Sequence, residues 1–507
     1  MASIQFITCF ILLLPALIFI AGFTKPVISI PVLIVYAYWL GIQFHQLLKQ
    51  YRPFRQKINA IKRYFPELTI AVLATTLWLW PSGIGGIGYI HHDANMTNTT
   101  FYHLIHDDWP IWFTPEYLGD KFSYQESRPF VYYIGYYLPA ALLGKLLGWT
   151  LGELSLFLWT WLCTFLVVLH SLLYIKQQQI YPKSYLYGLF LFLFCLYGGL
   201  DWWANSWLHA TTERAELWDV PFLFLSNTRL LYWSSHNSLP VWLLMALLLE
   251  NVPETGQTKL LGPALVSVLI WTPIGLIGVV PFCVLYLLLS TSQQKSNLFD
   301  RWSVGLSIVT GLLLATFITS NSFTFPVEWL PTASWLPRFT VKYLLFLGTE
   351  LITTVGVFLL TQSRNTSRET RFILLAYSLL LLIPFVRLGI WNDWCSKTSM
   401  AALFVVSFLA TKNAVSNGLP PWKQLVSIVL LFISTFTGGE ELLAALQSFS
   451  INVHVVPHEF RDYGQYYVTE QRIGKPDSFF FRLFAKESGS TQAVKQQPGS
   501  SFPAIYK

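Results

Sequence analysis

The chain has 507 residues, of which 54% are apolar and only 12% are charged. Soluble multidomain proteins carry about twice this share of charged residues, so the composition excludes a soluble protein and indicates one that lies in a lipid bilayer. The formal net charge of +7 would suggest a nucleic-acid partner in a soluble protein. Here the positions of the basic residues along the chain indicate the orientation of the protein in the membrane instead, and we expect no nucleic-acid partner.

Apolar stretches that approach the length of a membrane-spanning helix, about 20 residues, recur along the chain. The first, at 5–23, has no basic segment before it and is followed by a second at 28–46, so we interpret both as retained helices and not as a signal peptide. With the later stretches they predict an all-α polytopic bundle of about 13 spans. The later spans are predicted at 68–88, 152–175, 184–200, 237–250, 261–275, 277–290, 303–319, 340–361, 372–388, 399–411 and 424–440.

The orientation of the bundle follows from LKQYRPFRQKINAIKR at 48–63, which holds six basic residues and no acidic one. The positive-inside rule places such a loop in the cytoplasm. Residues 1–67 then form an N-terminal unit of two spans and this loop, and 68–440 form the transmembrane core. An odd number of spans puts the N-terminus inside and the tail, 441–507, outside, where we expect a small appendage whose final stretch is disordered.

The first long outer loop, 89–128, is acidic and leads into FVYYIGYYLPAALLGKLL. If this segment and 152–175 both crossed the membrane, the basic KQQQIYPK loop that follows would lie outside, against the positive-inside rule. Pro139 interrupts the segment, and its tyrosines favour the boundary between membrane and water. We therefore predict an interfacial or re-entrant helix at 129–148, with a kinked spanning helix as the alternative.

The chain shows no pattern typical of a metal centre or a disulfide framework. Its five cysteines are scattered without a CxxC pair. The histidines of the first outer loop are too irregularly spaced to be called ligands, so no metal site is predicted. These histidines are His91, His92, His103 and His106.

The predicted topology brings the polar residues of several outer loops to one membrane surface. A carboxylate there can take a proton from an acceptor hydroxyl or hold a divalent ion, and cations can stabilise a departing phosphate. The acids of the first outer loop that could act in catalysis are Asp93, Asp107 and Asp108. The residues that could bind the phosphate of a donor are Arg128, Arg229, His236, Arg387 and Lys397.

A bundle with short loops, an aspartate in its first long outer loop and RPFVYYIGYYLPAALLGKLLG after it resembles the GT-C superfamily of integral membrane glycosyltransferases. It also resembles uncharacterised bacterial multipass proteins related to them. Those proteins carry a D-W-D-K-H-N motif, a W-P-V eleven residues after its Asn, and a late loop of the form N-D-F-x-M-R-x-S. The matching positions here, within a resemblance that covers about 68–485, are Asp93, Asn98, Trp109, Asn392, Asp393, Trp394, Lys397 and Ser399.

The resemblance implies transfer of a sugar from a polyprenyl-phosphate carrier to a glycan, lipid or protein acceptor, with inversion at the anomeric carbon. It implies a plasma or inner membrane protein with its active site on the non-cytoplasmic face. Asp93 would be the general base or the ligand of a divalent cation, Mg²⁺ or Mn²⁺. Contacts to the acceptor or the sugar would come from His92, Asn98, Trp109, Asn392 and Asp393. Because the first motif keeps only its first acid and its final Asn, an inactive or repurposed family member is an alternative.

Two other functions compete with this one. Glu350 lies near the middle of the span at 340–361, and an acid at that depth indicates a functional site. A proton-coupled transporter that uses Glu350 is therefore the alternative from another class. A polysaccharide polymerase or ligase is the alternative within the enzymes, although the late outer loops at 320–338 and 387–398 are short for one. The enzyme requires Asp93 to share one membrane surface with the cations above.

Overall fold

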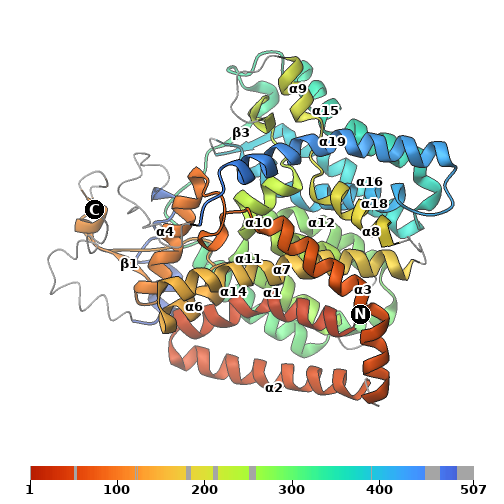
Figure 1. Ribbon diagram of the computed structural model, residues 1–507. Coiled ribbons are helices and arrows are strands. Elements are labelled where there is room, and N and C mark those ends of the chain that lie inside the picture. Colours follow the sequence, from red (N-terminus) through yellow and green to blue (C-terminus); the bar gives the residue numbers. More distant parts are fainter. Residues whose placement is uncertain are drawn as a thin grey trace.

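The computed structural model describes residues 2–50, 54–119, 122, 124–178, 184–208, 215–250, 258–389, 391–451 and 469–487. Long helices pack side by side into one bundle (Figure 1). In chain order the first helices are α1 (Ala2–Phe23), α2 (Pro26–Gln50), α3 (Phe54–Leu79), α4 (His92–His106), α5 (Pro115–Leu118), α6 (Leu138–Leu147), α7 (Trp149–Gln177), α8 (Ser184–Cys195), α9 (Asp201–Trp207) and α10 (Asn227–Leu249). The others are α11 (Thr258–Trp271), α12 (Pro273–Leu289), α13 (Ser292–Leu298), α14 (Arg301–Ile318), α15 (Phe339–Thr361), α16 (Ser367–Leu382), α17 (Asp393–Thr398), α18 (Met400–Ala414) and α19 (Pro421–Gln447).

Two short antiparallel pairs complete the described structure. Strand β1 (Trp112–Phe113) pairs with β2 (Arg128–Pro129), and β3 (Val327–Trp329) pairs with β4 (Val386–Leu388). Single-turn helices are η1 (Ile84–Gly86), η3 (Ala215–Leu217), η4 (Leu330–Thr332), η5 (Gln362–Arg364), η6 (Ile383–Phe385) and η8 (Phe480–Phe484). All strands lie in connections between helices, so the fold is all-α in its core.

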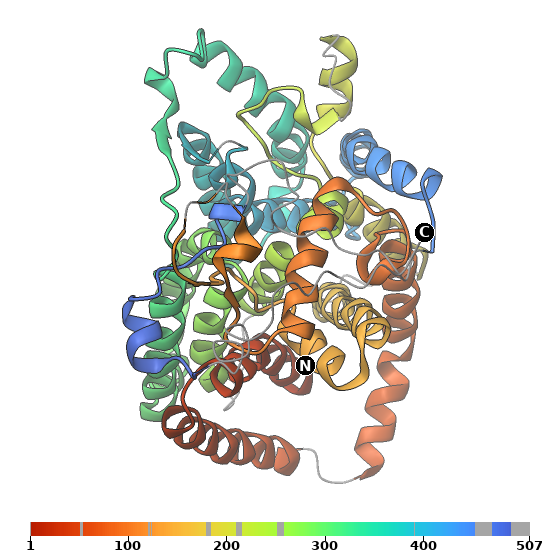
Figure 2. The same cartoon turned by 90° about the vertical axis from the view of Figure 1, so that its left-hand side faces the viewer.

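One end of the bundle carries most of the connecting structure, and we call it the α4 end. It faces left in Figure 1 and the viewer in Figure 2, where α4 lies across its middle. Isolated bridges join segments that are distant in sequence at this end, between 24 and 485, 87 and 451, 130 and 473, and 321 and 474. The predicted outer loop at 89–128 is therefore not an open loop, since it contains α4, α5, β1 and the start of β2.

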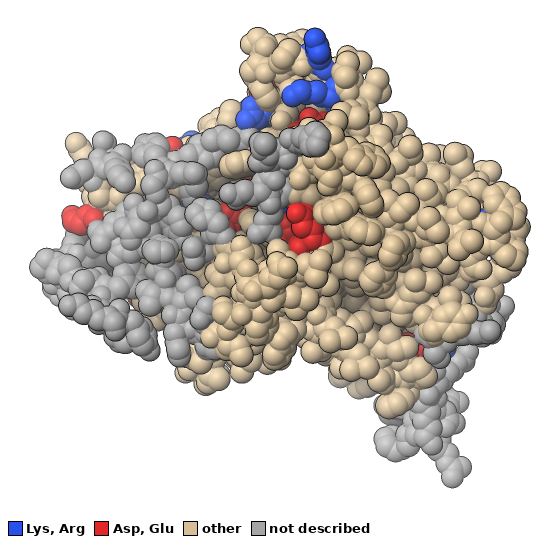
Figure 3. All heavy atoms as spheres, turned by 45° about the horizontal axis from the view of Figure 1, so that its top comes forward, with Lys and Arg blue, Asp and Glu red and all other residues tan. Residues whose placement is uncertain are grey.

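Six helices in the described ranges are long and apolar enough to cross a membrane by length and composition: α1, α2, α7, α14, α15 and α19. The remaining predicted spans each overlap a helix that is shorter or less apolar. In Figure 3 lysine and arginine side chains gather at the top and acidic side chains near the centre, whereas the flank on the right is almost without charge. The all-α membrane-type bundle thus agrees with the sequence, while the number of spans and the GT-C topology stay predictions.

The predicted interfacial helix at 129–148 is wrong over its first half. Helix α6 begins only at Leu138, with Pro139 in its first turn, where a missing N–H costs no hydrogen bond. Pro139 therefore starts this helix and does not kink it. With ten residues, about 15 Å long, α6 is also too short to span a bilayer core of about 30 Å.

Residues 130–137 run through the end of the bundle as an irregular strand because other segments satisfy their backbone. The Phe130 N–H donates to Ile111 O at 3.0 Å, and the Gly135 N–H donates to Ile270 O at 2.8 Å. A side chain at Gly135 would lie 2.9 Å from the Ile270 side chain, so only glycine fits where this segment passes the end of α11.

The tail predicted as an appendage is in part built into the α4 end. Figure 2 shows the last described stretch, 469–487, in dark blue, running from the middle of this end to its edge. Its backbone forms hydrogen bonds with the junction between α1 and α2. The Lys25 N–H donates to Phe484 O at 2.8 Å, and the Lys486 N–H donates to Phe23 O at 3.0 Å. The final stretch, predicted as disordered, lies outside the described residues.

The opposite end of the bundle holds a buried ion pair. Lys412 Nζ of α18 lies 2.5 Å from Glu369 Oε1 of α16, and both side chains are 1% exposed. Glu369 also closes a capping box with Thr366 at the start of α16, and Tyr174 of α7 donates to the same carboxylate oxygen at 2.7 Å. One carboxylate thus joins three helices.

We predict that Glu369→Gln destabilises the protein by about 3 to 5 kcal/mol, because it keeps the capping box but leaves the Lys412 ammonium buried without its counter-charge. Thermal unfolding of the detergent-purified protein measures this. The double variant Glu369→Gln/Lys412→Met should recover most of the loss. Glu126→Gln, which breaks the solvent-exposed pair with Arg128, should cost less than about 1 kcal/mol. Equal effects of the buried and the exposed substitution would contradict the prediction.

Candidate functional site

The irregular segment 130–137 holds four tyrosines and packs against neighbouring helices, and we call it the tyrosine segment. The Tyr136 hydroxyl lies 2.5 Å from Thr160 Oγ1 of α7. The Tyr133 ring stacks on His236 of α10, with 5.6 Å between ring centres. Because the segment is not helical, its side chains point to several helices at once and line a shared space.

Helix α10 is broken where it faces the tyrosine segment. Ser234 has non-helical angles, φ −137° and ψ 31°, and Pro240 lacks the N–H that the carbonyl of His236 would otherwise accept from. Ser238 Oγ donates to the carbonyl of Leu230 at 3.0 Å, and Asn237 Nδ2 donates to Ser234 Oγ at 2.8 Å. Broken helices inside an apolar bundle are tolerated where they line a cavity.

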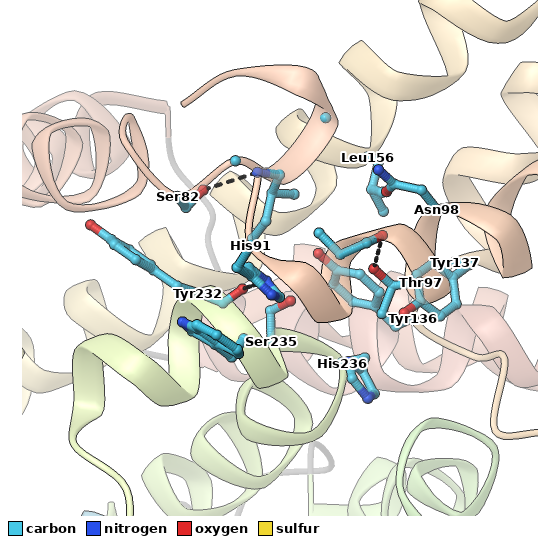
Figure 4. A pocket seen from close by; sticks show the side chains of 15 residues that line it. Ser82, His91, Thr97, Asn98, Tyr136, Tyr137, Leu156, Tyr232, Ser235 and His236 are labelled. Atoms are coloured by element: carbon cyan, nitrogen blue, oxygen red, sulfur yellow. Dashed lines mark hydrogen bonds between the residues drawn. The ribbon is translucent and has the colours of Figure 1, made fainter. Parts of the chain in front are cut away.

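A cavity of about 30 Å³ lies between this break, the tyrosine segment, α4 and the turn after α3. This volume admits one or a few water molecules. Figure 4 shows its polar side chains, which come from α4, the tyrosine segment and α10. The lining residues are Ser82, Gly83, Ile84, Gly85, His91, Ala94, Thr97, Asn98, Tyr136, Tyr137, Leu156, Tyr232, Trp233, Ser235 and His236.

The start of α4 forms one wall of the cavity. His91 precedes the helix, stacks on the Trp233 ring at 4.2 Å and places Nε2 3.2 Å from Tyr232 O (Figure 4). Asp93 stands in the first turn of α4, next to Ala94 and one turn before Thr97, both of which line the cavity. The positive end of the helix dipole stabilises a carboxylate at this position.

A lysine contacts the tyrosine segment next to the cavity. Lys397 Nζ of α17 donates to the Tyr133 hydroxyl at 3.1 Å and lies 3.1 Å from Asp393 Oδ1. Tyr133 in turn stacks on His236, which lines the cavity. A continuous set of contacts therefore leads from Lys397 to the cavity wall.

Among the residues predicted for the site, the structure brings one group together around the cavity. Asn98 and His236 line it, Asp93 stands in the first turn of α4 beside the lining residue Ala94, and Lys397, which pairs with Asp393, contacts Tyr133. These residues come from three separate regions of the chain, as the prediction of one shared surface requires.

A second group of predicted site residues has structural roles. Trp109 is buried, stacks on Phe23 and bonds through Nε1 to Leu104 O at 2.8 Å, so it offers no surface to a sugar. Asn392 is fully buried and caps α17 from a left-handed backbone conformation, φ 53°. Asp107 accepts from His103 Nδ1 at 2.7 Å.

Of the two remaining predicted site residues, one does not line the cavity and the other has a side chain outside the description. Asp108 is exposed and does not line the cavity. The side chain of His92 lies outside the described residues, so its predicted contact with the acceptor stays a prediction.

The three predicted arginines are engaged with carboxylates. Arg128 lies 3.1 Å from Glu126, and Arg387 lies 3.4 Å from Glu328 between β3 and β4. Arg229 is buried between two acids, 3.3 Å from Glu216 and 3.2 Å from Glu441. Because acids of the protein already compensate its charge, Arg229 is a poor candidate for binding a phosphate.

Glu350 has a buried acidic neighbour that the sequence did not indicate. Asp201 of α9 is 1% exposed, accepts from Trp218 Nε1 at 2.8 Å and faces the Glu350 carboxyl of α15. Gly199, with φ +46°, leaves the space that Glu350 fills, because a side chain there would lie 2.4 Å from Glu350 Oε2. The two acids meet only in the fold, since about 150 residues separate them along the chain.

Two further features of the site escaped the sequence. Arg472 lies over the Tyr132 ring, with Cζ 4.4 Å from its centre, although its segment was predicted as an appendage. The break in α10 was hidden in an apolar helix, and its signal was the polar run SSHNS before Pro240. Polar residues directly before a proline inside an apolar stretch could have indicated it.

The described residues contain no group of three or more His, Cys, Asp or Glu side chains arranged to hold a metal ion. The Mg²⁺ or Mn²⁺ that the resemblance implied for Asp93 therefore has no preformed set of protein ligands in this part of the chain. We derive no step through a metal.

Comparison of the chain with protein-family models, with curated proteins and with solved structures found no match. The likeness to GT-C enzymes accordingly remains an expectation drawn from short motifs. The assignments that follow rest on the geometry of the α4 end.

We predict that stability falls as the pH rises from about 4 to about 7 and that Asp201→Asn removes part of this fall. Burial raises the pKa of the Asp201 carboxyl to about 7, whereas the unfolded chain releases this proton near pH 3.9. Between these values the folded state holds the proton more tightly, so raising the pH disfavours folding. Unfolding temperatures of both proteins across this range measure it, with Glu116→Gln as an exposed control. Parallel profiles for wild type and Asp201→Asn would refute the assignment.

Proposed function

We propose that the protein is a membrane glycosyltransferase that moves a sugar from a polyprenyl-phosphate carrier to an acceptor at the α4 end. The observation that carries this proposal is that Asn98 and His236 line one cavity at the α4 end, that Asp93 stands in the first turn of the helix that forms its wall, and that Tyr133 connects Lys397 to His236. In this arrangement the acid would act on the acceptor, the polar wall would contact the sugar, and the cation would bind the phosphate.

In the proposed reaction Asp93 is the general base. The acceptor hydroxyl attacks the anomeric carbon, the bond from that carbon to the phosphate oxygen breaks, and the carrier phosphate leaves with the electron pair. The acceptor proton passes to Asp93. Lys397 stabilises the charge of the leaving phosphate, and attack from the face opposite to it inverts the anomeric centre.

The charge distribution supports a donor bound at headgroup height. A polyprenyl tail fits the apolar flank of the bundle, and its phosphate avoids the high cost of placing a charge at the centre of a bilayer. By the positive-inside rule the basic segment at 48–63 faces the cytoplasm, which puts the α4 end on the non-cytoplasmic side of the plasma or inner membrane.

The cavity must widen for the reaction to occur. Its volume of about 30 Å³ lies far below the 300 Å³ or more of a typical small-molecule pocket. In the proposed cycle α4 and the tyrosine segment separate to admit the sugar and then close to exclude water.

The proposal predicts that purified protein consumes a donor from a panel of polyprenyl-phosphate sugars and releases polyprenyl phosphate. Asp93→Asn should lower this rate by about 100- to 10,000-fold, because the base is lost. Glu116→Gln, an exposed acid at the same end, should leave the rate unchanged. If the wild type consumes no donor, or if Asp93→Asn keeps the full rate, the glycosyltransferase proposal fails.

A proton-coupled transporter is the second candidate, and the buried pair of Asp201 and Glu350 favours it. Two neighbouring carboxyls in an apolar bundle can exchange a proton as conformations change. Glu350→Gln separates the two functions. It should abolish proton-driven uptake by a transporter, whereas it should leave sugar transfer at the α4 end largely intact.

A further inference from the structure

The lining of the cavity at the α4 end is polar but carries no acid, lysine or arginine. Its fifteen described residues offer the hydroxyls of serine, threonine and tyrosine, one asparagine amide and two imidazole rings. A ligand that brings an uncompensated charge into such a space loses its hydration without gaining a counter-charge, whereas hydroxyl groups need only hydrogen-bond partners. The cavity therefore suits an uncharged polar ligand.

Several hydroxyls of the lining are engaged within the protein, but the Asn98 amide is not. Thr97 Oγ1 donates to Ala94 O at 2.9 Å. The Tyr232 hydroxyl donates to Trp78 O at 2.6 Å. In the part of the chain that the structure describes, no residue bonds to the side-chain amide of Asn98. Because a carboxamide both donates and accepts, Asn98 offers a ligand hydroxyl either kind of hydrogen bond from α4.

Asn237 determines which nitrogen of the His236 ring carries the proton. Asn237 Nδ2 lies 2.8 Å from His236 Nε2 and donates to it, since an amide nitrogen cannot accept. Nε2 is therefore unprotonated, and the proton of the neutral ring is on Nδ1. The same Nδ2 donates to Ser234 Oγ at 2.8 Å, which holds the amide in this orientation. The break in α10 thus places a fixed hydrogen-bond acceptor, Nε2, on the amide and leaves Nδ1–H as the donor of the ring.

The surroundings of His236 also favour the neutral ring. Lys397, Arg472 and His91 are its electrostatic neighbours, and positive neighbours disfavour a further cation. Among the described residues none accepts from Nδ1. His236, which lines the cavity (Figure 4), therefore presents a neutral N–H donor. This state favours a hydrogen bond to a sugar oxygen over the phosphate contact predicted from the sequence.

We propose that the cavity receives the sugar of the donor as an uncharged hexose, held by Asn98 and by Nδ1–H of His236, and that Asn237 is a positioning residue that keeps His236 a donor. The inference rests on the proposed function and names its substrate class. Asn98 and His236 belong to different helices, so hydroxyls of one hexose can bridge α4 and α10 once the cavity has widened. A uronic acid or an amino sugar would bring a charge that the lining does not compensate.

Comparing carriers with and without a sugar separates this site from the contact to the phosphate. The affinity of the full-length protein in detergent is measured for polyprenyl phosphate alone and for carriers bearing glucose, mannose, galactose or glucuronic acid. At least one neutral hexose should strengthen binding about 10-fold over the bare carrier, whereas glucuronic acid should not strengthen it. His236→Phe keeps a ring on Tyr133 but loses the donor, so it should remove most of this gain. His236→Asn keeps a donor and should retain part of it.

His106→Phe is the matched control, because it replaces an exposed histidine of α4 that does not line the cavity and should bind like the wild type. Unfolding temperatures check that the variants fold. No gain for any neutral hexose, an equal gain for glucuronic acid, or a full gain in His236→Phe overturns the inference. If a donor is consumed without such a gain, the proposed function stands and the inference fails. If the gain depends on His236 but no donor is consumed, the proposed function fails and the sugar site stands.

The role of Asn237 is tested on the protein without a donor. Nitrogen-15 NMR of histidine-labelled protein reports the tautomer, and the signals lost in His236→Phe identify this ring. The inference predicts a neutral ring protonated at Nδ1 from about pH 5 to 8, and a mixture of tautomers in Asn237→Leu. A ring protonated at Nε2, or one that becomes doubly protonated as the pH falls through about 6.5, overturns it. If Asn237→Leu does not fold, the spectrum of the wild type decides.

Discussion

Irregular backbone inside an apolar bundle must find hydrogen-bond partners within the protein, and this constraint shapes the α4 end. Unpaired N–H and C=O groups cost several kcal/mol each where water is absent, by a rough estimate. Here Gly135 donates to the last turn of α11, and Ser238 reaches back to the carbonyl that the break in α10 leaves open. The same two departures from regular structure open the space in which the candidate site lies.

The distribution of charge at the α4 end separates two environments that lie close together. Trp233 connects them: its ring stacks on His91 at the cavity, and its Nε1 donates to Glu441 at 3.1 Å beside Arg229. On the first side two acids flank Arg229, and on the second Lys397 contacts both Asp393 and Tyr133.

The pattern of apolar residues in the sequence predicted the positions of the helices. Each predicted span overlaps a helix. Asn98 and His236, from separate regions of the chain, line one cavity, whereas the outer face predicted for them stays a prediction. The sequence-based predictions failed where contacts with distant parts of the chain determine the local structure. Residues 129–137 belong to an apolar run that we predicted as helix, but they bond to α11 and to 469–487. Trp109 and Asn392 match motif positions yet serve packing and capping. The place of Arg472 depends on strand pairing across more than 300 residues, for which no local pattern exists.

The central claim is that Lys397 holds the phosphate of the donor and that the cavity beside α4 holds the sugar attached to it. An experimental structure of the full-length protein with bound polyprenyl phosphate tests this most directly. The account predicts phosphate density in contact with Lys397 Nζ, with its free oxygen directed to the cavity at α4. Phosphate density at Arg229 or Arg387, or at the opposite end of the bundle, would contradict it.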